Sequence, residues 1–562
     1  MTTQRYGHWL VLCKAKYHFV TAGARKGRAE PTGPGPIPLL LAGAFVGVHQ
    51  TMGRRRDQGP GGLAGLRRDL RSTLQELGKR TSAAHKRMVL LVILVGAALR
   101  VWMLLAPVTN AEAFTVVHFA TGDWAGVFSD RTLPGNHILH TALVKCCLGL
   151  FGPALWSVRA PDLVAGILCL PLLYVFVRAM FNRYVALLAL ALAAAAPQLV
   201  LFSALSEGVS IGWFLFLLAL NGSRHLVKRN NPITALLVGL LLALLIWNDP
   251  GQLQVALMVL LWIPAYLMSS YETSLAQRMG RYAIVPLTAL LAGIVLFLPV
   301  IIAHGVGQVF DPGLGTEPVD WASFSAGHQE AVLALWEHLS APYGMTFSLL
   351  ALGGQFVAVY LSGKYRLLVA AMAIGGLAAV FLRLMVPAPE DWTYMVLVFH
   401  LGTALLLFYL LKLVQDHLWA GFAKRMRTMA GALLMLVLGT ALTLGRGTEQ
   451  LVVRYAEADV VVRQLRSRIA DGSGVVLAQP PWHAPVGYYL YTRDMDPRRF
   501  APAGRPKGMG INYVLVAPSD GQDLNGVLRH HELDPLRTTS IRKLQDLQRS
   551  EIFAVRMEPV AR

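Results

Sequence analysis

The chain has 562 residues, of which 55% are hydrophobic and 15% are charged, and its mean hydropathy is +0.49. An ordinary soluble domain has about 25% charged residues, so this composition excludes soluble, disordered and fibrous proteins and indicates a polytopic membrane protein. The net charge of +19 is concentrated in residues 1–87, which hold 16 Lys and Arg against 4 Asp and Glu. A basic segment before a membrane helix is typical of a cytoplasmic anchor to anionic lipid, which argues against nucleic acid as a partner.

Residues 1–87 are interpreted as a basic, partly disordered cytoplasmic segment. Residues 23–62 are rich in Gly, Pro and Arg without steady periodicity, which predicts disorder, and residues 63–80 are expected to form a short basic helix on the membrane surface. Residues 1–51 are expected to be dispensable, because their composition cannot build a core and their one apolar run, Ile37–Val48, is too short to span a membrane. Met52 and Met88 are candidate alternative starts of translation.

Residues 88–446 are interpreted as a transmembrane domain, because a spanning helix needs about 20 mostly apolar residues and eleven segments approach that length. The predicted spans are 88–107, 161–181, 184–202, 205–222, 232–248, 252–270, 282–303, 343–361, 366–386, 392–412 and 428–446. Lys and Arg cluster in every second connection, which places the N-terminus in the cytoplasm by the positive-inside rule. Eleven spans then place residues 447–562 outside the cytoplasm. The protein is expected in the inner (plasma) membrane of the cell.

Two long loops, 108–158 and 304–342, fall on the predicted outer side. Long loops often carry function, although a solvated cap over the bundle is the alternative for the second loop. The second loop has five acidic residues and no Lys or Arg; the acids are Asp311, Glu317, Asp320, Glu330 and Glu337.

The first outer loop holds the candidate site. Glu112 follows the first span directly, and a carboxylate there could deprotonate an acceptor hydroxyl or ligate a divalent cation, Mg²⁺ or Mn²⁺. His137 and His140 are three residues apart, so on a helix they share a face. Each of these residues alone is a weak signal, and a solvated glutamate is the plain alternative for Glu112.

Four short motifs follow one another between the first and second spans. They are Ala111-Glu112-Ala113, Asn136-His137-Ile138-Leu139, Phe151-Gly152 and Trp156-Ser157-Val158-Arg159-Ala160-Pro161. Together they resemble the family 39 group of the GT-C membrane glycosyltransferases, which includes protein mannosyltransferases and the aminoarabinose transferases that modify lipid A. The resemblance runs from about Val89 to Arg446, and more faintly to residue 562, where Pro480-Pro481-Trp482-His483 and the residues that follow are also family-like.

The resemblance implies an α-helical polytopic membrane protein of GT-C type, with about eleven transmembrane helices. It implies transfer of a sugar from a polyprenyl-phosphate-linked donor to an extracytoplasmic acceptor, which is a glycan, a lipid or a protein. Membrane lipids are the remaining expected partners, and the metal ligands are left unassigned. Glu112 is expected to be catalytic, and the expected substrate contacts are Asp123, Asn136, His137, His140, Arg159 and Glu207.

The chain departs from the family pattern at two positions of the expected site. Ala111 replaces the first acid of the family's pair, and Glu207 stands where an arginine would suit a lipid phosphate. The phosphate would then be held by other cations, such as Arg159, Lys145 or Arg383. A family member that binds lipid-linked glycan without turnover is therefore the first alternative. A transporter or flippase is the second, although the sequence shows no internal repeat or pair of broken helices.

Residues 447–562 are predicted to form a small extracytoplasmic α/β domain, because strand-like and helical patterns alternate there. Residues 452–468 have apolar residues at helical spacing, while 474–478, 512–517 and 552–557 are strand-like. Residues 541–547 are expected to be helical. The four cysteines of the chain suggest neither a disulfide framework nor a zinc site.

Overall fold

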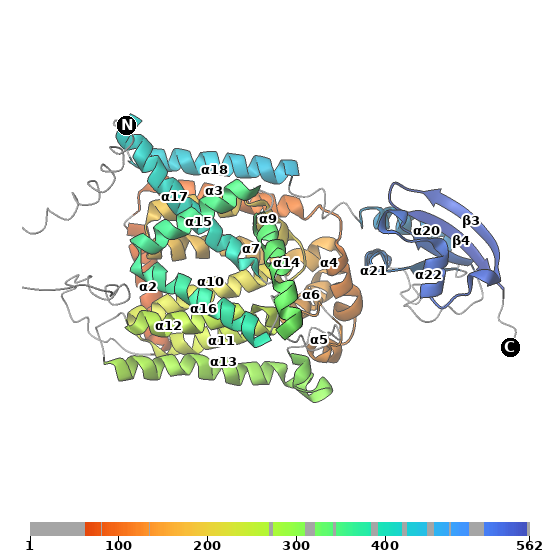
Figure 1. The fold of residues 1–562 in the computed structure, drawn as a ribbon, viewed down its shortest axis with the longest axis horizontal. Helices are drawn as coiled ribbons and strands as arrows, with labels where there is room; N and C mark the ends of the chain where they lie inside the picture. The colour runs from red at the N-terminus through yellow and green to blue at the C-terminus, as the bar shows by residue number, and fades with distance from the viewer. Residues whose placement is uncertain are drawn as a thin grey trace, which may run out of the picture. The chain divides into compact units, whose positions relative to one another are not determined.

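The computed structural model describes residues 62–558, except 80, 134, 269–273, 310–320, 341–343, 384–391, 419–423, 447–454, 471–473 and 494–510. Figure 1 shows the fold, with a bundle of long helices and a small sheet formed by the end of the chain. The predictions for residues 1–61 and for Asp311, Glu317 and Asp320 lie outside the described residues.

Each of the eleven predicted spans lies on a long helix or on a bent pair of helices. The helices are α3 (Ala83–Met103), α7 (Leu155–Met180), α8 (Arg183–Ala194) with α9 (Pro197–Ala204), α10 (Val209–Arg229), α11 (Pro232–Asn248), α12 (Leu253–Met268), α13 (Leu275–His304), α15 (Gly344–Leu361), α16 (Gly363–Arg383), α17 (Tyr394–Leu418) and α18 (Lys424–Arg446). Among the described helices, six are long and apolar enough to cross a membrane, or seven if α8 and α9 form one span bent by 60°. The predicted polytopic helical fold is thus confirmed, whereas its orientation in the membrane stays a prediction.

The bend between α8 and α9 is stabilised by a buried arginine. Pro197 begins α9, where its missing N–H costs no helical hydrogen bond. The carbonyl groups at the end of α8 are left without helical donors, and Arg100 of α3 donates to the oxygens of Ala193 and Ala194, at 3.3 and 2.9 Å. The bend directs α9 into the short segment before α10 that contributes to the site described below.

Both predicted outer loops contain helices that the span analysis did not place. The described helices of the first loop are α4 (Asn110–Phe114), the π-helix η1 (Thr115–Ala120), α5 (Trp124–Ser129) and α6 (Ile138–Phe151); those of the second are η3 (Gly307–Val309) and α14 (Trp321–Ser340). Two further described helices are α2 (Leu63–Lys79), before the bundle, and η2 (Pro250–Gln252), between α11 and α12.

The end of the chain forms a four-stranded mixed sheet with helices, which confirms the predicted α/β character. Its elements are α20 (Glu457–Ala470), β1 (Gly474–Ala478), α21 (His483–Thr492), β2 (Ile511–Val516), η7 (Pro518–Asp520), α22 (Leu524–His530), η8 (Pro535–Arg537), β3 (Thr538–Asp546) and β4 (Glu551–Met557). The strand order is β1-β2-β4-β3, in which only β1 and β2 are parallel.

The helix expected at residues 541–547 is wrong, because most of this segment belongs to strand β3. The register of β3 against β4 shifts twice, between Thr538 and Ser540 and between Lys543 and Gln545. Each irregularity interrupts the alternation of side chains along the strand. In the sequence, the apolar residues Ile541 and Leu544 are three positions apart, a spacing that imitates a helix.

Candidate functional site

Glu112 begins the site as part of a helix cap. Thr109 is the N-cap of α4; its side chain accepts from the Glu112 N–H at 3.2 Å, while Glu112 Oε2 accepts from the Thr109 N–H at 2.9 Å. The local sequence Thr-x-x-Glu is the pattern of a capping box, which satisfies two backbone donors at the start of a helix. The cap fixes Glu112 at the end of the connection from α3, and its side chain is fully buried.

Arg159 of α7 reaches the same carboxylate and is equally buried. Its Nε donates to Glu112 Oε1 and its Nη2 donates to Oε2, both at 2.7 Å, which is a bidentate ion pair. The remaining N–H groups donate to the backbone oxygens of Leu104, Ala106 and Pro107 at 2.7–3.1 Å. A guanidinium has five N–H donors, so every donor of Arg159 is used within the protein, and Arg159 joins α7 to the turn that follows α3.

The segment between α9 and α10 supplies a fourth donor to Glu112. The Ser206 N–H donates to Glu112 Oε1 at 2.7 Å. Two residues later, Gly208 adopts a φ of +75°, and a Cβ at this position would lie 3.1 Å from the Cβ of His140. Only glycine adopts this backbone region without strain, so Gly208 allows the segment to pack closely against α6.

His140, Ser206 and Asp162 form a second buried cluster beside the ion pair. His140 Nε2 lies 2.9 Å from both Ser206 Oγ and Asp162 Oδ2. Ser206 donates its one hydroxyl proton to the oxygen of Val158 at 2.9 Å, so His140 Nε2 must be the donor to the serine oxygen. A nucleophilic serine needs its histidine to accept its proton, and this arrangement has the opposite polarity; the cluster is therefore not a hydrolase triad.

Asp162 connects this cluster to the start of α10. Ser210 Oγ lies 2.8 Å from Asp162 Oδ1, and the Gly208 N–H donates to Oδ2 at 3.4 Å. The Asn248 side chain of α11 donates to the Gly208 oxygen at 3.1 Å. The two carboxylates, Glu112 and Asp162, thus fix the segment 206–210 between them.

Glu207 lies on the same segment but is half-buried rather than buried. The Thr109 hydroxyl donates to Glu207 Oε1 at 3.1 Å, so one threonine contacts both glutamates of the site. The structure therefore brings together four of the residues expected from the sequence, namely Glu112, Arg159, His140 and Glu207.

The other expected residues have local roles. Asp123 caps α5, accepting from the Gly126 N–H at 2.8 Å, and the Asn136 amide donates to the oxygens of Val127 and Asp130. His137 is the half-buried N-cap residue of α6, and burial lowers its pKa below the usual range. His137 lies at the edge of the cluster, since a Cβ on Gly208 would lie 3.4 Å from its Cβ.

The C-terminal α/β residues also contact the site. Ala484 and Tyr488 of α21 pack with Val108, Ala113 and Val158. The Tyr489 hydroxyl accepts from the Val108 N–H at 3.4 Å. Burial raises the pKa of Tyr488, and the nearby charge of Glu112 raises it further, so this phenol stays protonated.

The cations considered for a lipid phosphate are also engaged or not described. Lys145 donates to the backbone oxygens of Ala120 and Gly122, and the side chain of Arg383 lies outside the described residues. Among the described side chains, no three His, Cys, Asp or Glu residues form a group that could hold a metal ion. A cation at Glu112 would have to displace Arg159, so the residues described do not fit a metal there.

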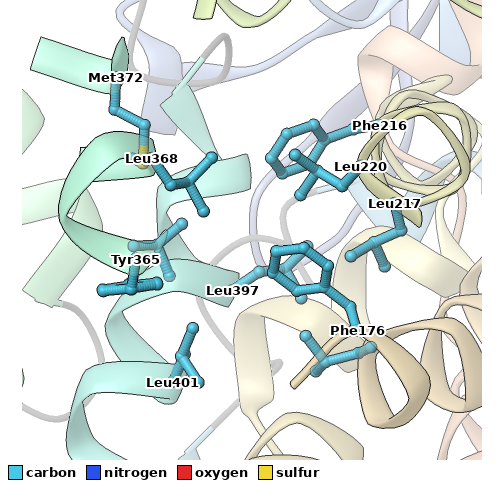
Figure 2. A pocket seen from close by; sticks show the side chains of 11 residues that line it. Phe176, Phe216, Leu217, Leu220, Tyr365, Leu368, Met372, Leu397 and Leu401 are labelled. Carbon is cyan, nitrogen blue, oxygen red and sulfur yellow. The ribbon is translucent and has the colours of Figure 1, made fainter. Parts of the chain in front are cut away.

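A small pocket elsewhere in the bundle has a different lining. Figure 2 shows its side chains, which come from α7, α10, α16 and α17 and are apolar apart from one tyrosine. They include Leu173, Phe176, Phe216, Tyr365 and Leu401. The pocket therefore has no charged group with which to carry out chemistry, and the polar cluster remains the candidate site.

Comparison with known proteins supports the fold. No protein-family model matches the chain, and no curated protein matches it either. The crystal structure of ArnT from Cupriavidus metallidurans in the apo state matches with a TM-score of 0.54, at 13% sequence identity, over 84% of this chain and 98% of that chain. ArnT is an aminoarabinose transferase with a GT-C fold. The chain shares this GT-C fold. The predicted resemblance is thereby confirmed at the level of the fold.

Two further structures are similar to the chain, less closely. ArnT bound to undecaprenyl phosphate matches with a TM-score of 0.47, at 15% identity, over 83% of this chain and 97% of that chain. The Archaeoglobus fulgidus oligosaccharyltransferase tethered with an acceptor peptide matches with a TM-score of 0.47, at 12% identity, over 78% of this chain and 69% of that chain.

Sequence reasoning missed three residues that build the cluster: Thr109, Asp162 and Ser206. Two of them had a readable signal. Thr109 is the first residue of the Thr-x-x-Glu capping pattern, and Asp162 is an ionisable residue inside a predicted span, which is a functional signal by default. Ser206 contributes through its backbone N–H as well as its hydroxyl, and no pattern in the sequence indicates that contact.

Proposed function

We propose that the chain transfers a sugar from a polyprenyl-phosphate-linked donor to an extracytoplasmic acceptor. The observation that carries the proposal is the ArnT-like fold over 84% of the chain, combined with a buried polar cluster around Glu112, which lies in the loop that follows the first span. ArnT itself has been crystallised with undecaprenyl phosphate. We also propose that α4 to α6 and the C-terminal α/β residues lie outside the cytoplasm, where a lipid-linked donor would meet its acceptor.

Glu112 is proposed as the carboxylate on which transfer depends. Its two oxygens accept four hydrogen bonds, from Thr109, Ser206 and Arg159. A role as general base requires that one of these donors leave when substrates bind. A positioning role requires no such change, because Glu112 already orients Arg159 and the segment that carries Glu207.

A member that binds lipid-linked glycan without turnover is the second candidate. The full engagement of Glu112 and Arg159 favours it, since neither group offers an unused hydrogen-bonding site to a substrate in this conformation. Transfer and binding alone are distinguished by one assay. Purified protein in lipid is given a polyprenyl-phosphate sugar, and release of polyprenyl phosphate is measured beside binding of the intact donor.

The decisive variant is Glu112→Gln, which keeps the size of the side chain and removes its charge. If the carboxylate supports transfer, the rate should fall about 10²-fold or more. A pH profile separates the two roles: loss of the base removes the acidic limb of the profile, whereas loss of positioning lowers the rate at every pH. Asp123→Asn is the matched control, because Asp123 is an exposed cap of α5. Unchanged turnover in Glu112→Gln would reject the assignment.

A further inference from the structure

Helix α2 has an exposed face that no other part of the described chain covers. It is a 17-residue helix, and Leu63 and Leu70 are 72% and 51% exposed on it. The two leucines are seven positions apart and so lie in one row. Two large apolar side chains so exposed would be costly in water, and a row of them on a basic helix indicates a contact surface.

Arginines flank this row of leucines. Arg67 and Arg71 are exposed and lie four residues apart, next to the leucine row, and Arg68 is also exposed. Asp69 is the one acid among the described side chains of α2, and it is turned to another face. The exposed surface of α2 therefore combines apolar and positively charged side chains without a described negative charge.

A different face of α2, which carries Asp69, and the preceding Gly62 are attached to the end of α10 and to the connection that follows it. Asp69 lies 3.8 Å from Arg229 and 3.9 Å from His225, and the Asn231 amide donates to the Gly62 oxygen at 3.3 Å. These contacts determine which face of α2 packs on the bundle. Among the described residues, this attachment leaves the leucine row on a face of α2 that does not pack against the helical bundle.

The position of α2 in the bundle suits a membrane surface. Figure 1 shows α2 at the end of the bundle opposite α4, α5 and α6, running across the ends of the long helices rather than along them. Helices that lie in the membrane interface place apolar residues among the acyl chains and Lys or Arg near the lipid phosphates.

We propose that α2 is an interfacial helix that binds anionic phospholipid, with Leu63 and Leu70 among the acyl chains and Arg67 and Arg71 on lipid phosphates. Charge complementarity selects this partner, since the exposed face offers guanidinium groups, which bind phosphate through paired N–H donors. The proposal is independent of glycosyl transfer, because α2 lies outside the candidate site.

The test uses the full chain in nanodiscs, with its four cysteines replaced by alanine and one cysteine introduced for a fluorescent label. Leu70→Cys reports the leucine row, and Gln75→Cys is the matched control, exposed on the same helix but roughly 140° around it. Brominated lipids should quench the label at position 70 and not at position 75. Iodide in the aqueous phase should quench the two labels in the reverse order.

The charge requirement is tested by comparing phosphatidylcholine nanodiscs with phosphatidylcholine–phosphatidylglycerol nanodiscs. Lipid quenching at position 70 should be stronger with the anionic lipid and should weaken with added salt. Arg67→Gln/Arg71→Gln should lower the equilibrium constant for docking of α2 on the anionic membrane about fivefold or more, measured as reduced lipid quenching at position 70. Arg463→Gln/Arg466→Gln on α20 makes the same charge change on exposed residues elsewhere and should have no effect.

Three outcomes would overturn the proposal. One is equal lipid quenching at positions 70 and 75. Another is lipid quenching at position 70 that changes neither with phosphatidylglycerol nor with the arginine substitutions. The third is protection of position 70 from iodide without lipid quenching and only at high protein concentration, which would make this face an interface between copies of the chain.

Discussion

The first turns of α7 bury Ser157, Arg159 and Asp162, whereas its later turns bury Leu173, Phe176 and their apolar neighbours. Both ends are close-packed, but only the first is specified by hydrogen bonds of fixed direction. In a bundle surrounded by lipid, packing of apolar side chains gains little from the hydrophobic effect, and similar shapes can replace one another. Charged groups have no such freedom, because each needs its partners. The beginning of α7 is therefore where single substitutions should have large effects.

The largest effect on stability is expected for Arg159→Met. The substitution leaves the Glu112 carboxylate and the oxygens of Leu104, Ala106 and Pro107 buried without their donor. Removing one partner of a buried ion pair costs about 3–5 kcal/mol, so the protein should unfold well below the wild-type temperature in detergent. Arg159→Lys should rescue only part of this loss, because an ammonium group has three donors rather than five.

A double variant separates the charge from the carbonyl contacts. Glu112→Leu/Arg159→Met leaves no carboxylate buried without a partner, so it should unfold at a higher temperature than Arg159→Met alone. It should remain less stable than wild type, since the three carbonyl oxygens still lack donors and the N–H groups of Thr109 and Ser206 lose their acceptor. A double variant as unstable as the single one would mean that the ion pair itself contributes little.

The intermediate effect is expected for Asp162→Asn. Its carboxylate oxygens accept from the Ser210 hydroxyl, the Gly208 N–H and His140 Nε2. An amide at this position would direct an NH₂ group toward one of these donors. Leaving a buried group without its hydrogen bond costs about 1–3 kcal/mol. Leu401→Met in the apolar pocket is the contrasting variant, with a cost of less than about 1.5 kcal/mol. Equal thermal shifts for the two substitutions would contradict the proposed difference between the polar start of α7 and the apolar packing around its later turns.

The same contrast explains how far the sequence could lead. All eleven predicted spans lie on helices because apolar length is a local property that composition reports directly. The short helix α6 was hidden in a predicted loop, since its 14 residues fall below the length that a span requires. Strand β3 was misassigned because Ile541 and Leu544 are three positions apart, a helical spacing, although they lie on a strand whose register against β4 is irregular.

The site was predictable only in part, for a physical reason. Glu112, His140 and Arg159 stand out as polar residues near span ends, and the motifs indicated them. Their pairing depends on contacts between residues 22 or more positions apart, such as His140 with Asp162, Arg159 with Glu112 and Ser206 with Glu112. Periodicity carries no information about such contacts. The sequence therefore predicted a catalytic carboxylate. In the structure, each oxygen of Glu112 already accepts two hydrogen bonds, from Thr109, Ser206 and Arg159.

The last effect depends on pH and concerns two stacked histidines. His118 of η1 and His483 of α21 stack with ring centroids 5.9 Å apart. Burial, and then the neighbouring His118, lowers the pKa of His483 to about 4, and burial lowers the pKa of His118 as well. Both groups titrate at an ordinary pKa of about 6.5 once unfolded. The unfolded chain therefore binds more protons between about pH 6.5 and 4, and stability should decline as pH falls through this window.

Melting temperatures measured from pH 8 to pH 4 in buffers of constant ionic strength check this prediction. His483→Gln should flatten the decline, and His118→Gln should flatten it less, because the charge of Asp130 opposes the effect of burial on the pKa of His118. The double variant should change the slope by less than the two single variants together, since each histidine disfavours protonation of the other across the stacked pair. A decline that is unchanged in His483→Gln would place the acid sensitivity in another region of the molecule. Purely additive slopes would mean that the stacked rings do not interact electrostatically.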